Sequence, residues 1–148
     1  MVRNFTPADL EPVAEIWLTA NCQAHPFIPA SYWEDRLEEV KTALLQAEVY
    51  VWEERGTPLG FVGLQGGYIA GIFVRPGEQS RGGGRLLLAR ARAGREPLTL
   101  SVYRKNIRAA AFYRREGFSL LKEGIDPATG EAEETMIWTR LKGGEPLC

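Results

Sequence analysis

Residues 72–88 read Ile72-Phe73-Val74-Arg75-Pro76-Gly77-Glu78-Gln79-Ser80-Arg81-Gly82-Gly83-Gly84-Arg85-Leu86-Leu87-Leu88. The first three residues favour a strand, the last three favour a helix, and glycine dominates the segment between them. Helix N-termini expose unpaired N–H groups and the positive end of the helix dipole, so phosphate binds there readily. The segment therefore predicts a phosphate-binding loop beside Arg81 and Arg85. A flexible loop before a solvated basic helix is the alternative.

Two better-known phosphate loops fit this segment less well. The chain has no Gly-Lys-Ser/Thr, so the nucleoside-triphosphate P-loop is absent. A dinucleotide fold places its glycine loop after the first strand, with an acidic residue about 20 positions on. Here the loop follows a late strand, and the residues around position 104 are basic.

A second motif follows one predicted strand later. It reads Asn106-x-x-Ala109-x-x-Phe112-Tyr113-x-x-x-Gly117-Phe118. With Gln79-x-x-Gly82-x-Gly84 it resembles, in order and spacing, the two hallmarks of the GNAT N-acetyltransferase family. The resemblance covers nearly the whole chain. The segment His25-Pro26-Phe27-Ile28, with Tyr32-Trp33, is most similar to small single-domain bacterial members that acetylate protein lysines.

The resemblance implies acetyl-CoA as co-substrate. Its pantetheine would pair with the strand 72–74, and backbone amides of 81–85 would hold its pyrophosphate. Asn106 would contact the pantetheine region or cap its own helix, and both interpretations stay open. The cofactor-binding residues implied in this way are Ile72, Phe73, Val74, Gln79, Arg81, Gly82, Gly83, Gly84, Arg85 and Asn106.

Tyr113 matches the tyrosine that protonates the leaving thiolate in many relatives. A phenol titrates near 10 and a thiol near 8.5, so a tyrosine is a neutral proton donor at pH 7. The alternative is an aromatic residue that packs on the sheet, as we expect for Phe112 and Phe118.

The attacking amine must be neutral. Deprotonating a lysine amine at pH 7 costs about 4.6 kcal/mol, and an α-amine only about 1.4 kcal/mol. Many relatives place a glutamate on a central strand, but 68–74 and 98–102 contain none, and Ser101 stands where an acid is expected. The sequence therefore leaves two alternatives for the general base: a water molecule relayed through polar groups, or no base at all.

Four residues are candidates for the acceptor groove, and each has a packing alternative. His25 is the only histidine of the chain, its pKa suits a base, and it lies between the first two predicted helices. The others are Phe27, Tyr68 and Tyr103. An acidic group on the second predicted helix is either an attraction for a cationic amine or a solvated face; it comprises Glu34, Asp35, Glu38 and Glu39.

Working outward, hydrophobic periodicity and turn signals predict an α/β or α+β domain with a mixed sheet covered by helices. The resemblance implies that this domain has the GNAT fold, with a central, mixed, mostly antiparallel sheet flanked by about four helices. We expect one domain over 1–141 and a flexible tail over 142–148. The predicted strands cover 2–5, 49–54, 59–65, 68–74, 98–102, 118–123 and 134–141. The predicted helices cover 9–20, 31–46 (with a Ser31-x-x-Glu34 capping box), 82–93 and 108–116, and Asp9 is the expected N-cap of the first.

Charge is segregated along the chain. The 148 residues have a net charge of -1, yet residues 75–115 sum to +9 between flanks of -6 and -4. A block this basic predicts a phosphorylated ligand or a polyanion. We find no nucleic-acid-binding motif, so the small phosphorylated cofactor is preferred. Five of the basic side chains either meet the 3′-phosphate of CoA or are solvated: Arg104, Lys105, Arg108, Arg114 and Arg115.

Composition excludes several other classes. No apolar run approaches the roughly 20 residues of a membrane helix, and the N-terminus lacks a signal-peptide core. One histidine and two distant cysteines predict neither a metal site nor a disulfide framework, so a reducing cytoplasm is expected. We therefore predict a cytoplasmic N-acetyltransferase, monomeric or homodimeric, acting on a protein lysine or N-terminal amine. A small-molecule acetyltransferase and a non-catalytic acyl-CoA-binding domain are the alternatives.

Overall fold

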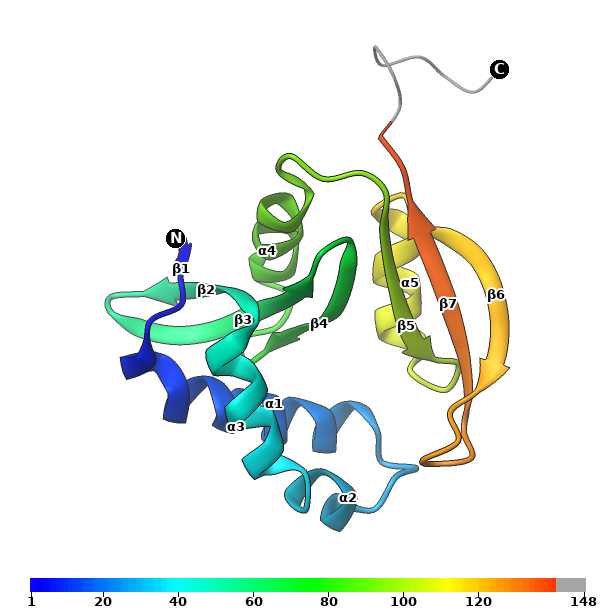
Figure 1. Cartoon of the computed structure of the whole chain (residues 1–148), viewed down its shortest axis with the longest axis horizontal. Helices are drawn as coiled ribbons and strands as arrows, with labels where there is room; N and C mark the ends of the chain where they lie inside the picture. Colours follow the sequence, from blue (N-terminus) through cyan, green and yellow to red (C-terminus); the bar gives the residue numbers. More distant parts are fainter. Residues whose placement is uncertain (141–148) are drawn as a thin grey trace.

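Seven strands form one sheet in residues 1–140, the part of the chain that the computed structural model describes (Figure 1). The strands are β1 (Val2–Asn4), β2 (Glu48–Glu54), β3 (Thr57–Gln65), β4 (Tyr68–Val74), β5 (Leu98–Tyr103), β6 (Ser119–Ile125) and β7 (Ala132–Trp138). The helices are α1 (Leu10–Ala24), α2 (Ala30–Glu34), α3 (Leu37–Gln46), α4 (Gly83–Arg92) and α5 (Ile107–Arg115), with a 3-10 turn η1 (Pro7–Asp9). The predicted tail 142–148 lies outside the described residues.

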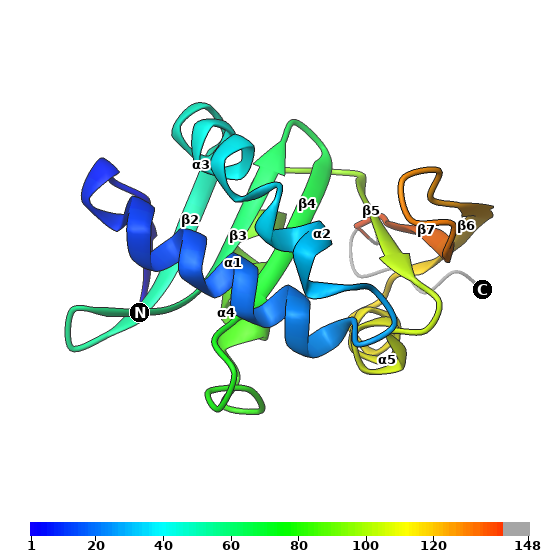
Figure 2. The ribbon, with the colours of Figure 1, turned by 90° about the horizontal axis from the view of Figure 1, so that it is seen from below.

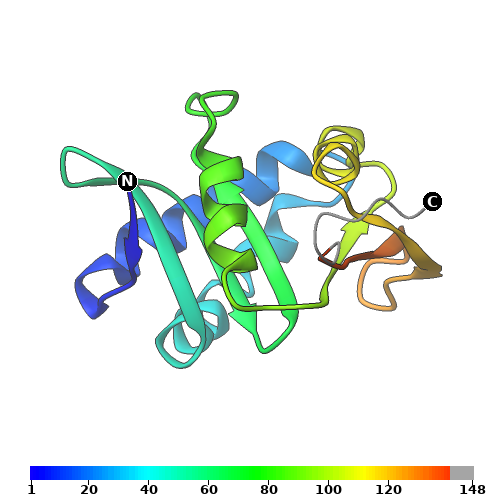
Figure 3. The same ribbon diagram turned by 90° about the horizontal axis from the view of Figure 1, so that it is seen from above.

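Helices cover both faces of this sheet. One core joins α1 and α3 to residues such as Val51 and Phe61, and Figure 2 shows these helices with α2 in front of the strands. The other core joins α4 and α5 to residues such as Val62 and Leu100, on the face seen in Figure 3. Alternating side chains of β2 and β3 thus pack into two cores, which is the layered α+β arrangement that the sequence predicts. Within residues 1–140, no helix is both long and apolar enough to cross a membrane.

The predicted helix over 31–46 is wrong in one respect, because two helices, α2 and α3, occupy it. The break falls at Asp35 and Arg36. Trp33 is buried and packs edge-to-face on Trp17 of α1, while α3 turns its own apolar side to the other core. The capping box is also wrong, since Ser31 lies inside α2 and the N-cap is Pro29. Tertiary burial overrides the local signal here.

The sheet order is β1-β2-β3-β4-β5-β7-β6, and β4–β5 is its parallel pair. That ladder holds only two residue pairs, Tyr68↔Thr99 and Ile69↔Leu100. A bulge opposite Gly63 and Leu64 bends β4 directly after these pairs. Beyond it, β4 continues to pair with β3 alone, and β5 turns to β7.

An ion pair closes the N-terminal end of the fold. Arg3 donates two hydrogen bonds to the Asp9 carboxylate, at 2.8 and 2.9 Å, and also pairs with Glu53 of β2. Asp9 holds the N-cap position of α1, as predicted, but its carboxylate makes no cap bond there and accepts from the Thr6 N–H instead. Hydrogen bonds from Arg3 lower the pKa of Asp9 below its ordinary value of 3.8.

We expect Asp9→Asn to lower the free energy of unfolding by about 1–3 kcal/mol at pH 7, the range for a hydrogen-bonded charge. A carboxylate with a lowered pKa stabilises the fold above its ordinary pKa and loses that contribution as the pH falls through the lower value. The difference between the variant and the wild type should therefore shrink below about pH 4. Urea denaturation from pH 7 to pH 3 measures it. Glu11→Gln, which removes an exposed partner of Lys41, is the control that should change little.

Candidate active site

The hydrogen-bond register of β3 and β4 leaves one edge of β4 open. The Arg75 N–H donates to the Leu59 carbonyl at 2.8 Å. Bonded and non-bonded positions alternate in an antiparallel ladder, so Phe73 bonds to β3 while Ile72 and Val74 point their N–H and C=O groups away from it. These groups face the side of β4 on which β5 no longer pairs with it. Of the predicted strand 72–74, the backbone of Ile72 and Val74 is therefore available for pairing with an extended ligand.

The glycine loop ends at the first turn of α4. Gly82 is the N-cap residue in the left-handed region, with φ +85°, and Ser80 has φ +67°. The first helical bond runs from the Leu86 N–H to the Gly82 carbonyl. The N–H groups of residues 83–85 therefore have no partner within the helix. Free N–H groups at a helix start suit an anion, which is the ligand chemistry that the sequence predicts for this loop.

Two glycines of this turn are required by close packing. A Cβ at Gly83 would lie 2.3 Å from the Trp52 ring, and a Cβ at Gly84 would lie 3.3 Å from Phe112 of α5. Gly83 therefore lets the helix start rest on β2. Gly84 lets it approach α5, which brings the two sequence motifs together in space.

Side chains tie the loop to α1 and α5. Arg108 donates to Gln79 Oε1 at 3.1 Å and to Ser80 Oγ at 2.9 Å, and Gln79 Nε2 donates to Gln23 Oε1 at 3.2 Å. Gln79 thus positions the loop. Ser80 and Gln23 are not among the predicted site residues, because their roles depend on contacts between distant segments.

The two arginines predicted to add charge at the loop are already paired. Arg81 contacts Glu54 at 2.7 Å and also Glu78, whereas Arg85 lies 3.2 Å from Glu116. Both are exposed, so each can exchange its carboxylate for a phosphate at little cost.

Tyr113 projects from α5 into the core and reaches the open edge of β4. Its ring is 7% exposed and packs against Phe112 and Phe118. Burial raises the pKa of Tyr113 well above its ordinary value of 10, and the nearby backbone amide of Ile72 only partly opposes this. The phenol therefore carries its proton at neutral pH. The packing and proton-donor interpretations coexist, because the ring is core and the hydroxyl reaches the edge of β4.

Asn106 and His25 link the motif helix to the end of α1. Asn106 Oδ1 accepts from the Ala109 N–H at 3.3 Å and so caps α5, while its Nδ2 lies 3.3 Å from His25 Nε2. His25 Nδ1 lies 3.0 Å from the Asn21 carbonyl. Burial lowers the pKa of His25 below its ordinary value of 6.5. A neutral imidazole that donates from Nδ1 and accepts at Nε2 satisfies both contacts. His25 therefore stabilises the loop that follows α1.

Three of the four predicted acceptor residues come together. The ring centroid of Tyr103 lies 5.1 Å from that of His25 and 5.9 Å from that of Phe27, and His25 stacks on Trp33 at 5.2 Å. We name His25, Phe27, Trp33 and Tyr103 the aromatic wall. Tyr68 lies apart from it at the start of β4, 39% exposed. The acidic residues at 34, 35, 38 and 39 are exposed.

Comparison with known proteins identifies the family of this chain. Residues 46–120 match the model described as "Acetyltransferase (GNAT) domain". The chain is 38% identical over 140 residues to the peptidyl-lysine N-acetyltransferase YiaC of Escherichia coli K12, covering 93% of each chain. The chain belongs to the GNAT family of N-acetyltransferases. Both hallmark motifs recognised in the sequence are therefore GNAT motifs, and the predicted GNAT fold is confirmed.

Solved structures agree with the GNAT assignment. The solution structure of apo YjaB from Escherichia coli superposes with a TM-score of 0.82 at 26% identity, over 93% of this chain and 96% of that one. The yncA acetyltransferase of Salmonella typhimurium, solved with its cofactor acetyl-CoA, gives 0.67 at 19% identity, over 100% and 98%. At 19% identity, the likeness to yncA shows only that the two proteins share a fold.

Three cations of the basic block pair with carboxylates of the C-terminal hairpin. Arg104 pairs with Glu123 at 2.8 Å, and Arg114 pairs with Glu134 at 2.9 Å. Lys105 pairs similarly with Glu131 at 3.0 Å. These three exposed cations are paired with neighbouring carboxylates, and their two predicted roles, contact with the 3′-phosphate of CoA or solvated charge, stay predictions. In the described residues, no cluster of side chains suited to a metal ion is present.

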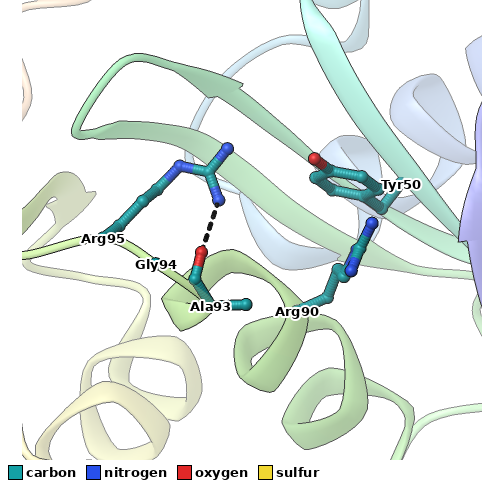
Figure 4. A pocket seen from close by; sticks show the side chains of 5 residues that line it. All are labelled: Tyr50, Arg90, Ala93, Gly94 and Arg95. Atoms are coloured by element: carbon teal, nitrogen blue, oxygen red, sulfur yellow. Dashed lines mark hydrogen bonds between the residues drawn. The ribbon is translucent and has the colours of Figure 1, made fainter.

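A separate pocket lies at the other end of α4 (Figure 4). Arg90 stacks over the Tyr50 ring at 4.5 Å, and Arg95 pairs with Glu48. The ten-residue helix places this pocket about 15 Å from the glycine loop. Its arginines are engaged, and it lies outside the candidate site.

We expect Gly84→Leu to raise the dissociation constant for acetyl-CoA about tenfold or more, since a branched side chain at 3.3 Å from Phe112 must displace α5 or the loop. Isothermal titration measures this constant. Gly124→Ala on β6, where a Cβ meets nothing within 4 Å, is the matched control that should bind normally. Equal affinity in Gly84→Leu would remove the loop as the phosphate site.

Proposed function

We propose that this chain is an acetyl-CoA-dependent acetyltransferase whose acceptor is the side-chain amine of a peptidyl lysine. One observation carries the proposal: the hydroxyl of the buried Tyr113 lies near the outward-facing amide of Ile72 at the open edge of β4. A proton donor and an unpaired strand edge thus lie together, next to an anion-binding helix start. The name of YiaC supports a lysine acceptor, because identity to it extends over almost the whole chain.

The residues present fit acetyl-CoA. The edge groups of Ile72 and Val74 need a partner, and an extended amide chain such as pantetheine supplies matching donors and acceptors. The free N–H groups of 83–85 suit a pyrophosphate. Bound acetyl-CoA supplies a thioester as the acyl donor, and yncA, a protein of the same fold, was solved with acetyl-CoA.

Tyr113 provides a proton at its hydroxyl. Because burial raises its pKa, the phenol is fully protonated at pH 7 and can donate to a thiolate that forms beside Ile72. The Ile72 amide stabilises the phenolate left behind. No covalent enzyme intermediate is needed, so we assign direct attack by the amine in a ternary complex.

The aromatic wall bounds the acceptor side. Phe27 and Tyr103 present ring surfaces that suit the aliphatic stem of a lysine. Lys105 places its ammonium 5.4 Å from the Phe27 ring, and this cation–π contact supports a surface suited to a lysine head group. His25 supports these rings through its contacts with Asn21 and Asn106.

We expect Tyr113→Phe to lower kcat about 100-fold, the scale of a lost general acid, with an acetyl-CoA dissociation constant within about twofold of wild type. Stopped-flow detection of the CoA thiol measures the rate. Tyr50→Phe, at the remote pocket, is the matched control that should keep full activity. An unchanged rate in Tyr113→Phe would remove Tyr113 as the acid.

A panel of acceptors tests the substrate class. We expect acetylation of N-terminally blocked peptides that contain lysine, and not of the same peptides with the lysine replaced by norleucine. Mass spectrometry locates the added group. Transfer only to free α-amines or to small amines would replace the lysine assignment, and binding of acetyl-CoA without transfer to any amine would indicate a regulatory domain.

A further inference from the structure

Glu133 of β7 lies beside the aromatic wall. Its partner across the ladder is Tyr103. The Arg104 N–H donates to the Ala132 carbonyl at 2.9 Å, so the adjacent Tyr103–Glu133 pair is a non-hydrogen-bonded pair, in which side chains approach most closely. Paired residues share a face of the sheet, and therefore the carboxylate of Glu133 projects on the same side as the Tyr103 ring.

Glu133 is a carboxylate without a cation. Its neighbours on this segment are paired: Glu131 with Lys105 at 3.0 Å, and Glu134 with Arg114 at 2.9 Å. Within residues 1–140, Glu133 forms no ion pair, although it is only half exposed. Lys122 lies on the same face of the sheet, opposite Thr135 in the ladder, and no ion pair joins it to Glu133 within the described residues. A negative charge is therefore left uncompensated on the wall of the acceptor region.

The surroundings of Glu133 favour a cation. Asp126, from the turn between β6 and β7, accepts a hydrogen bond from the Tyr103 hydroxyl at 2.5 Å and from the Ala128 N–H at 2.9 Å. Its carboxylate is thus engaged, yet its charge remains. Burial raises the pKa of Glu133 above its ordinary value, and Asp126 raises it further. A bound ammonium would relieve both effects.

We propose that Glu133 is the specificity residue of the acceptor site: it binds the ammonium of the incoming lysine, whose stem lies against Tyr103 and Phe27, and the amine attacks after the ammonium has released one proton to water. The proposal rests on the proposed function and names the group that selects a cationic acceptor. Figure 1 shows the segment between α1 and α2 reaching toward the β6–β7 turn, and the Tyr103 contacts with His25 and Asp126 confirm that these segments meet. Glu133 is a binding and positioning residue, distinct from the proton donor Tyr113.

Peptide binding to the CoA-loaded protein tests this assignment without turnover. The probes are an acetyl-capped pentapeptide with a central lysine between glycines and the same peptide with norleucine. We expect wild type to bind the lysine peptide about tenfold more tightly, the scale of a charge-assisted hydrogen bond, and Glu133→Gln to lose this preference. In steady state, Glu133→Gln should raise KM for the lysine peptide about tenfold and leave KM for acetyl-CoA unchanged.

Two further variants keep the result interpretable. Glu133→Asp retains the charge and should recover part of the preference. Glu123→Gln removes an ion-paired carboxylate from the opposite face of the same hairpin and should retain all of it. If Glu133→Gln keeps the lysine preference while wild type acetylates lysine peptides, the role of Glu133 is wrong and the proposed function stands. If wild type acetylates no lysine peptide, the proposed function itself fails, and the role of Glu133 fails with it.

Discussion

The parallel ladder between β4 and β5 ends after two residue pairs, and the site is arranged around this interruption. Beyond it, the backbone groups of Ile72 and Val74 keep unmet hydrogen-bonding capacity, which folded proteins seldom leave unused. Each neighbouring element contributes to the same opening: α4 supplies free amides, α5 supplies the Tyr113 hydroxyl, and the segment after α1, with α2 and β5, supplies the aromatic wall. Because β4 and β5 form no further residue pairs, an opening is left between them, and groups from separate elements line it.

Much of this was predictable, because the signals are local. Strand 72–74, the glycine turn and the motif from Asn106 to Phe118 follow from short-range chemistry, and the observed strands and helices start and end close to the predicted residues. The role of Asn106 as a helix cap was one of two interpretations that the sequence left open, and its Ala109 contact shows that the cap forms. The fold class follows from the order of these elements.

What the sequence did not reveal depends on register and on burial. Nothing local shows that Trp33 is drawn into the wall and so breaks the helix predicted over 31–46. The neutralisation of Arg104 and Arg114 depends on which residues of β6 and β7 face them. Glu133 escaped notice for the same reason, since only the pairing with Tyr103 places it in the acceptor region.

The contact between Gly83 and Trp52 has an evolutionary consequence. The indole is 2% exposed and fills the volume that any side chain at position 83 would need. Mutational drift at either position is thus conditional on the other: a larger residue at 83 becomes tolerable only after the indole is replaced by a smaller group. The two positions, one on β2 and one at the start of α4, should diverge among descendants as a linked pair.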